Sequence, residues 1–179
     1  MSTTEQTAVS IPTGTWTADV VHSSVAFEVY YMGVSTFTGA IKDFAATLTD
    51  GLISGSAKIA SLETKDENLH AHLLAPDWFD AERFPEVSFA SSIVSGEGTK
   101  VEFEGTVTIK GVTQPSTLSG TITGPVTDPY GNERYGLQLE TTIDRTQFGL
   151  NWNAPMPDGS NALADDVILK ADLSLVEAK

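Results

Sequence analysis

Apolar and polar residues alternate one by one through most of residues 16–177. The run VEFEGTVTIK, residues 101–110, shows this most clearly, because Val101 and Phe103 share one face while glutamates occupy the other. Successive side chains of a β-strand point to opposite faces of a sheet, so the run predicts a strand with one dry and one wet face. The pattern as a whole favours an all-β fold.

Runs of this kind recur about eight times, a number of antiparallel strands that closes into a barrel able to hold one small ligand. We therefore predict a single domain over residues 13–179, folded as an eight-stranded antiparallel β-barrel. Residues 1–12 are small and polar, and we expect them to form a flexible tail. A two-sheet sandwich satisfies the same alternation and is the alternative architecture.

Two irregular features stand out within the predicted barrel wall. Ile41 and Phe44 cannot share a face at a period of two without an extra residue, so we predict a bulge at Lys42 and Asp43. A strand that begins near residue 53 presents an inward row of partly small residues: Ile53, Gly55, Ala57 and Ile59. Small side chains in this row are expected to leave part of the barrel interior unfilled.

One aromatic-rich segment, about residues 66–84, interrupts the alternation. Leu69 and Leu73 recur there at helical spacing and are followed by Trp78 and Phe79, which predicts a short helical segment over one end of the barrel. Two interpretations remain open. The apolar residues form an ordinary core plug, or they form a gate that controls the entry of a ligand.

Composition narrows the classes of partner. The net charge is −14 and the sequence pI is about 4.3, so the protein repels phosphate backbones and anionic bilayers, and we expect no nucleic-acid partner. The chain has no apolar run near the roughly 20 residues of a membrane helix and no signal-like start, so we expect a cytoplasmic protein without stable membrane insertion. It has no cysteine, which excludes disulfides and thiolate chemistry.

The three histidines suggest no catalytic or metal centre. His70 and His72 lie two residues apart on a predicted helix and point in different directions, so we expect no metal site. Asp19, His22 and Ser23 contain the residue types of a hydrolytic triad, but adjacent residues rarely align a hydroxyl with an imidazole. We expect these three residues to fix a turn by local hydrogen bonds.

Two further features have both a structural and a functional interpretation. Arg145 follows Asp144 at the end of a predicted strand, where it forms either a surface ion pair or a cation that meets a polar head group at the barrel mouth. Residues 151–159 form a long loop that contains Trp152, and this loop is either a ligand rim or a packed connection.

Several motifs in fixed order resemble the YceI-like family, lipocalin-like proteins regarded as carriers of polyisoprenoids and related lipids. The motifs are WTAD at 16–19, HSSVAF at 22–27, HL at 72–73, DWFD at 77–80, FPEVSF at 84–89, GTVTIKGVTQP at 105–115 and RTQFG at 145–149. The resemblance implies an extended barrel around an apolar tunnel, without recognised catalytic residues. Tyr31 stands where similar members often have histidine, and Leu69-His70 stands where they often have Arg-Asp.

These observations predict non-enzymatic binding, storage or transport of an amphiphilic lipid: a polyisoprenoid, an isoprenoid quinone or a fatty-acid-like molecule. No cofactor is expected besides the bound lipid, and an exposed barrel edge suggests a possible homodimer. The alternative is a solid-cored barrel that acts as a stress-associated interaction module. An enzyme with His22 as a general base ranks third. The predicted ligand-binding residues are Phe27, Val29, Tyr31, Leu73, Trp78, Phe79, Phe89, Phe103, Ile109, Arg145, Trp152 and Leu169.

Overall fold

The computed structural model describes residues 9–178, and most of them belong to one antiparallel sheet. Besides the strands, the described residues form one short helix, α1 (Glu67–Leu74), and two 3-10 turns, η1 (Ile59–Ser61) and η2 (Arg145–Phe148). The strands are β1 (Thr15–Ala18), β2 (Ser24–Tyr31), β3 (Ser35–Ile41), β4 (Phe44–Thr49), β5 (Leu52–Lys58), β6 (Leu62–Glu63), β7 (Glu86–Glu97), β8 (Lys100–Ile109), β9 (Val112–Thr127), β10 (Glu133–Asp144) and β11 (Leu163–Glu177).

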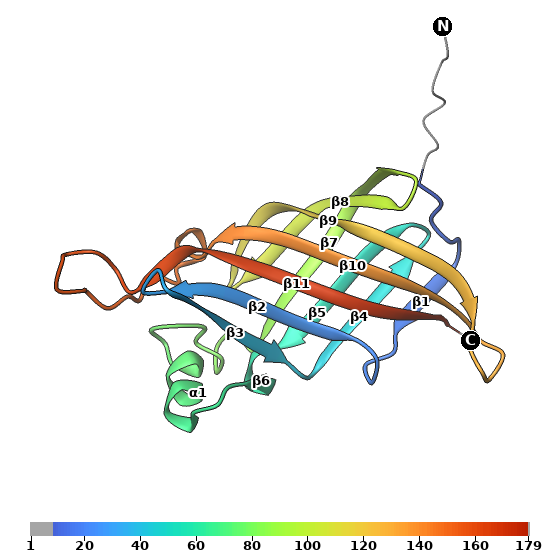
Figure 1. Cartoon of the computed structure of the whole chain (residues 1–179). Helices are drawn as coiled ribbons and strands as arrows, with labels where there is room; N and C mark the ends of the chain where they lie inside the picture. The colour runs from blue at the N-terminus through green and yellow to red at the C-terminus, as the bar shows by residue number, and fades with distance from the viewer. Residues whose placement is uncertain (1–8, 179) are drawn as a thin grey trace, which may run out of the picture.

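The sheet closes on itself through β11 (Figure 1). The last residues of β11 pair with β1, and its first two thirds pair with β2, so β1 and β2 together occupy one position in the wall. In the same way β3 pairs with β2 and β4 pairs with β1. The result is a closed eight-stranded antiparallel barrel, which confirms the predicted fold and excludes the sandwich.

The bulge predicted at Lys42 and Asp43 is instead a break between two strands, β3 and β4. Both backbone N–H groups bond to Ser61: Lys42 donates to its carbonyl at 3.3 Å and Asp43 to its hydroxyl at 2.8 Å. Because two residues leave the strand pattern here, Ile41 and Phe44 are both buried inside the barrel, as the phase slip predicts.

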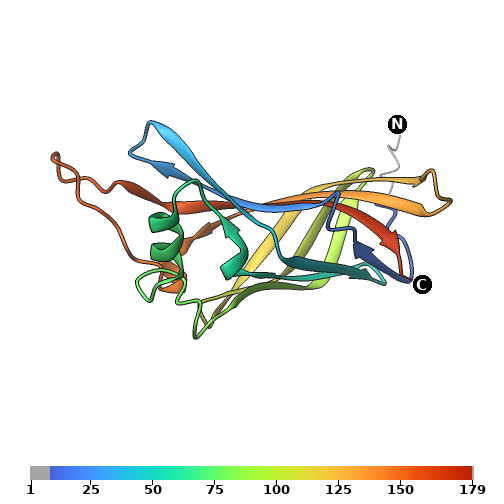
Figure 2. The same ribbon diagram turned by 90° about the horizontal axis from the view of Figure 1, so that it is seen from below.

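The helical segment covers one end of the barrel but is shorter than predicted (Figure 2). The Asp66 side chain accepts hydrogen bonds from the N–H groups of Asn68 and Leu69, and this N-cap starts α1. Pro76 follows the C-cap Ala75 and cannot continue the helix, so most of residues 75–84 form turns. No helix among the described residues is long and apolar enough to cross a membrane.

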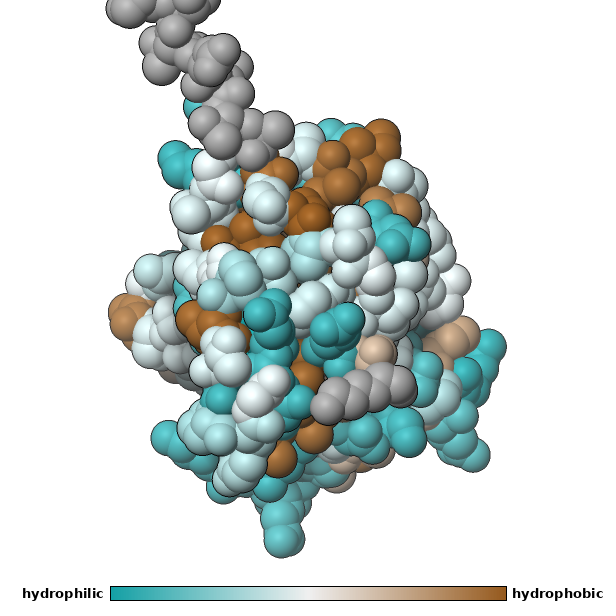
Figure 3. Space-filling model, turned by 90° about the vertical axis from the view of Figure 1, so that its right-hand side faces the viewer, coloured by the Kyte–Doolittle hydropathy of each residue, from teal (hydrophilic) through white to brown (hydrophobic). Residues whose placement is uncertain are grey.

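The barrel is solid at the end away from α1. Its core there consists of fully or nearly fully buried side chains from several strands: Trp16, Leu48, Val101, Phe103, Ile122, Leu137 and Leu175. Figure 3 views this end of the molecule, where apolar patches lie between mainly polar side chains.

The N-terminal segment touches the barrel where it is described. Val9 and Ile11 pack against the core, and Val9 N–H donates a hydrogen bond of 3.3 Å to the Gly96 carbonyl. Residues 1–8, which make up most of the predicted flexible tail, lie outside the described residues.

Candidate functional site

The half of the barrel nearest α1 contains a cavity of about 600 Å³. This volume falls within the range of about 300–1,000 Å³ that is typical of small-molecule sites. Strands β2, β3, β5, β7, β8 and β11 supply most of the lining, and α1 with the turns after it supplies the end. The predicted ligand residues that line the cavity are Phe27, Val29, Tyr31, Leu73, Trp78, Phe79, Phe89, Ile109, Arg145, Trp152 and Leu169.

Phe103 is the exception among the predicted residues. It shares the inward face of β8 with Ile109, which is why the alternation selected both. Phe103 lies further toward the solid end, where its side chain is 0% exposed and packs in the core instead of lining the cavity. Period-two alternation gives the face of a residue but not its depth along the barrel.

Small residues on the wall keep the interior open. Gly55 and Ala57 of β5 and Ala46 of β4 line the cavity from inward positions, and Ile53 of β5 lines it as well. A glycine or alanine at an inward position fills little volume, so the space beside it stays free of protein atoms. The inward row predicted from the sequence of β5 therefore does leave interior volume unfilled.

Helix α1 presents one face to the cavity through Leu69, His72 and Leu73. Their spacing of three and four residues places them on the same side of the helix. His72 was not among the predicted ligand residues, although its position between two inward leucines carries the signal. His70 points elsewhere, and its Nε2 lies 3.3 Å from the Ala60 carbonyl.

Aromatic rings cluster where α1 meets the loop before β11. The His72 ring packs edge-on against Trp152 with 4.9 Å between centroids and edge-on against Trp78 with 6.1 Å. The two indoles lie 5.5 Å apart. Trp78 is 8% exposed, and its buried Nε1 has no hydrogen-bond partner among the described residues.

Arg145 lies beside this cluster and is 2% exposed, so the interpretation as a surface ion pair with Asp144 is wrong. Its Nε donates to the Ala164 carbonyl at 2.9 Å, and its Nη1 donates to the carbonyls of Leu150 and Trp152. Burial lowers the pKa of the Arg145 guanidinium from its usual value.

Asp144 does not pair with that guanidinium and bonds to its own turn instead. Its carboxylate accepts from the Thr146 N–H at 2.9 Å and from the Thr146 hydroxyl at 2.6 Å. These hydrogen bonds lower the pKa of Asp144 and start η2, which places Arg145 on the inner side of the wall.

The cavity reaches the surface near the β2–β3 hairpin. Tyr31 lines the cavity and is 43% exposed, so it belongs to the mouth and not to the deep wall. Tyr30, Met32 and Val34 around it are also exposed apolar residues. The hairpin therefore places exposed apolar side chains near the opening.

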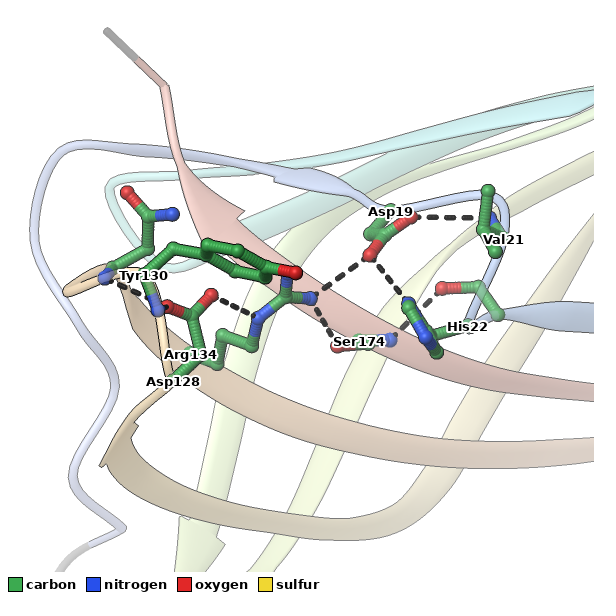
Figure 4. A network of polar contacts seen from close by, with 9 residues as sticks. Asp19, Val21, His22, Asp128, Tyr130, Arg134 and Ser174 are labelled. Atoms are coloured by element: carbon green, nitrogen blue, oxygen red, sulfur yellow. Dashed lines mark hydrogen bonds and ion pairs between the residues drawn. The ribbon is translucent and has the colours of Figure 1, made fainter.

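A polar network at the opposite end contains the residues that suggest a triad (Figure 4). His22 Nδ1 lies 2.7 Å from Asp19 Oδ2, while Ser23 Oγ accepts a hydrogen bond from the Ser174 N–H at 2.9 Å. The hydroxyl thus serves the backbone of β11, and no His22–Ser23 hydrogen bond forms among the described residues. The predicted role in fixing the β1–β2 turn is confirmed for Asp19 and His22 and is wrong for Ser23, which bonds to β11.

Arg134 joins this network from a distant strand, and the sequence did not single it out. Its Nη1 donates to Asp19 at 3.0 Å and its Nε donates to Asp128 at 2.8 Å, which joins the β1–β2 turn to the β9–β10 hairpin. Hydrogen bonds from His22 and Arg134 lower the pKa of Asp19 to about 2, and those from Arg134 and the Asn132 backbone lower the pKa of Asp128 to about 2.

Within the described part of the chain, no group of three or more histidine, cysteine, aspartate or glutamate side chains has the arrangement of a metal site. The cavity lining itself makes an apolar enclosure with a few polar groups at one end. A closed antiparallel barrel with such an interior defines a lipocalin-like β-barrel.

The chain belongs to the YceI-like domain family, whose model matches residues 16–175. A UPF0312 protein of Photorhabdus laumondii is 32% identical over 134 residues, which cover 71% of this chain and 70% of that protein. Protein YceI of Salmonella arizonae is 30% identical over 136 residues, covering 72% and 71% of the two chains.

Solved structures show the same fold. BcnA of Burkholderia cenocepacia matches with a TM-score of 0.69 and 23% identity over 90% of this chain and 99% of that chain. The YCEI protein of Campylobacter jejuni matches with a TM-score of 0.67 and 25% identity over 79% and 85%. A polyisoprenoid binding domain from Saccharophagus degradans matches with a TM-score of 0.67 and 10% identity over 91% and 98%.

Proposed function

We propose that this protein binds an amphiphilic lipid without chemical conversion and encloses its apolar tail in the barrel, as a carrier or a store. The observation that supports this most directly is the cavity of about 600 Å³ with its almost entirely apolar lining. The polyisoprenoid binding domain from Saccharophagus degradans, which shares the fold, supports a ligand of the same general class. Polyisoprenoids, isoprenoid quinones and fatty-acid-like molecules all have such tails.

Burial of the tail supplies enough free energy for this function. Each methylene transferred from water contributes about 0.8 kcal/mol, so a tail of about ten carbons contributes on the order of 8 kcal/mol. Loss of translational and conformational freedom subtracts several kcal/mol from that figure. The remainder is compatible with useful affinity, and polar contacts at the head group add specificity.

Native mass spectrometry of protein purified without detergent tests the proposal, followed by organic extraction of whatever is released. We expect a stoichiometric lipid that is lost from Tyr31→Ala, because Tyr31 lines the cavity mouth. Tyr130→Ala is the matched control, since Tyr130 is 88% exposed and lies on the β9–β10 hairpin, outside the cavity lining. A bare protein that also takes up no added quinone, polyprenyl lipid or fatty acid would overturn the proposal.

The rival function is an interaction module with a filled core. The solid half of the barrel agrees with it, because Phe103, Leu137 and Leu175 leave no room for a ligand there. The open half does not agree with it, since a filled barrel has no need of the small inward residues on β4 and β5. The bare-protein outcome above favours this rival.

A further inference from the structure

Two hydrogen-bond donor groups at the α1 end of the cavity, one on Trp78 and one on Arg145, make no hydrogen bond with the described residues. The first is Nε1 of Trp78, which is buried and unpartnered among the described residues. The Trp78 ring lines the cavity. A buried donor without an acceptor is costly, and native proteins rarely tolerate one without a functional reason.

The second donor group is Nη2 of Arg145. A guanidinium carries one N–H on Nε and two on each Nη, and the three carbonyls of Ala164, Leu150 and Trp152 account for Nε and Nη1. Nη2 makes no hydrogen bond with the described residues. Its nearest carboxylate oxygen, Oδ1 of Asp165, is 4.0 Å away on a side chain that is 63% exposed.

The two donor groups belong to neighbouring residues at the same end of the cavity. The guanidinium carbon of Arg145 is 5.5 Å from the centre of the Trp78 ring, and His72 packs edge-on against that ring. All three residues line the cavity. We call Trp78, Arg145 and His72 the donor cluster.

The charge of the cavity lining has the opposite sign to that of the whole protein. The chain has a net charge of −14, yet its cavity lining contains no aspartate or glutamate. The charged residues in the lining are Arg145 and Lys170, and Lys170 is already paired with Glu28 at 3.0 Å. Arg145 therefore presents an incompletely compensated positive charge to an apolar space, which favours an anion.

We propose that the donor cluster binds the anionic head group of the ligand, a carboxylate or a phosphate, whose oxygens accept from Trp78 Nε1 and Arg145 Nη2. This inference rests on the proposed lipid-binding function and specifies the ligand class. The tail then runs from the donor cluster along the small residues of β4 and β5 toward the solid half of the barrel. An amine head group, which is a cation and a donor, is disfavoured by the same charges.

A panel of amphiphiles with one hexadecyl tail and different head groups tests the proposal by calorimetric titration. The probes are palmitate, hexadecyl phosphate, hexadecanol and hexadecylamine. A hydrogen bond to a charged acceptor is worth enough to change affinity by about tenfold or more, so palmitate or hexadecyl phosphate should bind at least about tenfold more tightly than hexadecanol, with the amine weakest. The ratio between the two anions identifies which head group the site prefers.

Trp78→Phe provides the residue-level test because it keeps an aromatic ring and removes the N–H. Binding of the preferred anion should weaken about tenfold, whereas binding of hexadecanol should change much less. Trp16→Phe is the matched control, since the Trp16 indole donates to the Thr13 carbonyl and does not line the cavity. Circular dichroism of each variant establishes that it is folded.

The orientation is tested with two spin-labelled stearates in the Trp16→Phe background, which leaves Trp78 and Trp152 as the emitting indoles. A label near the carboxylate should quench their fluorescence more than a label near the methyl end. Equal affinity for palmitate, hexadecyl phosphate and hexadecanol, or the reverse order of quenching, overturns the inference and leaves the lipid-binding function standing. Failure of every probe to bind overturns both.

Discussion

Arg134 and Arg145 show how strongly the role of a residue depends on its neighbours. Arg134 lies at the barrel surface between the carboxylates of Asp19 and Asp128, and its hydrogen bonds lower the pKa of both. Arg145 is buried among backbone carbonyls, and its nearest carboxylate is 4.0 Å away. The sequence gives the same letter for both, so only the fold distinguishes a structural clamp from a cavity wall.

The contacts of Arg134 with Asp19 and Asp128, which we call the clamp, predict how the stability of the protein depends on pH. Asp19 and Asp128 have a pKa of about 2 in the folded protein against an ordinary value of 3.8, so between these values the unfolded chain binds more protons than the native state. Their stabilising contribution is therefore full above the unfolded pKa and is lost as the pH falls through about 2. In Arg134→Gln we expect lower stability at neutral pH and a shallower loss of stability in acid.

Urea unfolding midpoints, measured from neutral pH down to about pH 2, test this expectation. Lys58→Gln is the control, because it removes an exposed surface pair with Asp43 at 3.6 Å, a type of contact that contributes little. Parallel pH curves for the wild type and Arg134→Gln would show that the clamp does not set the acid stability.

Phe27 and Phe103 provide a matched test of where the barrel is hollow. Both are buried phenylalanines on inward faces, but only Phe27 lines the cavity. Phe103→Ala opens a void in the solid core and should cost about 3–5 kcal/mol of unfolding free energy. Phe27→Ala enlarges a space that is already there, so it should cost less stability and more lipid affinity. Chemical denaturation and a lipid titration of both variants measure the two effects.

At the level of secondary-structure elements, the strands could be predicted from the sequence. For the helix, the position could be predicted but the length could not. Alternation in β8 holds through every inward residue, because each faces the dry interior. This strand pairs with β9 in one continuous register, while its pairing with β7 shifts between Ser91 and Ile93. The extent of α1 depends instead on the Asp66 cap and on Pro76, and the aromatic residues beyond them pack without helical structure. Helical spacing alone cannot separate a helix from a folded turn that buries the same side chains.

The N-cap of α1 offers a way to loosen the end of the cavity without touching its lining. Asp66 Oδ1 accepts from Asn68 N–H at 2.8 Å and from Leu69 N–H at 3.1 Å, and the helix carries Leu69, His72 and Leu73. Asp66→Ala should cost about 1 kcal/mol and speed release of bound lipid, while Asp66→Asn should behave nearly as the wild type. Stopped-flow release of a fluorescent fatty acid measures the rate. An unchanged rate in Asp66→Ala would show that release does not require opening of α1.

At the scale of the whole molecule, the barrel divides into a solid half that carries stability and a hollow half that carries the site. The closed eight-stranded architecture and the face of nearly every wall residue could be predicted from alternation, as β8 and β11 show. The depth of Phe103 and the burial of Arg145 could not. Each depends on contacts between segments far apart in the chain, which no local pattern encodes.

This division predicts that the hollow half tolerates added volume. Ala57 of β5 is buried and lines the cavity, whereas Ala162 is buried beside β11 and does not line it. Ala162→Phe forces a ring into packed surroundings and should cost about 1–3 kcal/mol or more. Ala57→Phe places the ring in the cavity, so it should leave the melting temperature equal to or above that of the lipid-free wild type.

The same variant should lose the stabilisation that a ligand confers. Lipid that binds only the native state raises its stability in proportion to RT ln(1 + [L]/Kd), so the wild type should melt at higher temperature as lipid is added. In Ala57→Phe the ring occupies the space of the tail, and the melting curve should not move. If Ala57→Phe instead destabilises the lipid-free protein as much as Ala162→Phe, the cavity is closed by side chains in solution and the solid-cored rival gains support.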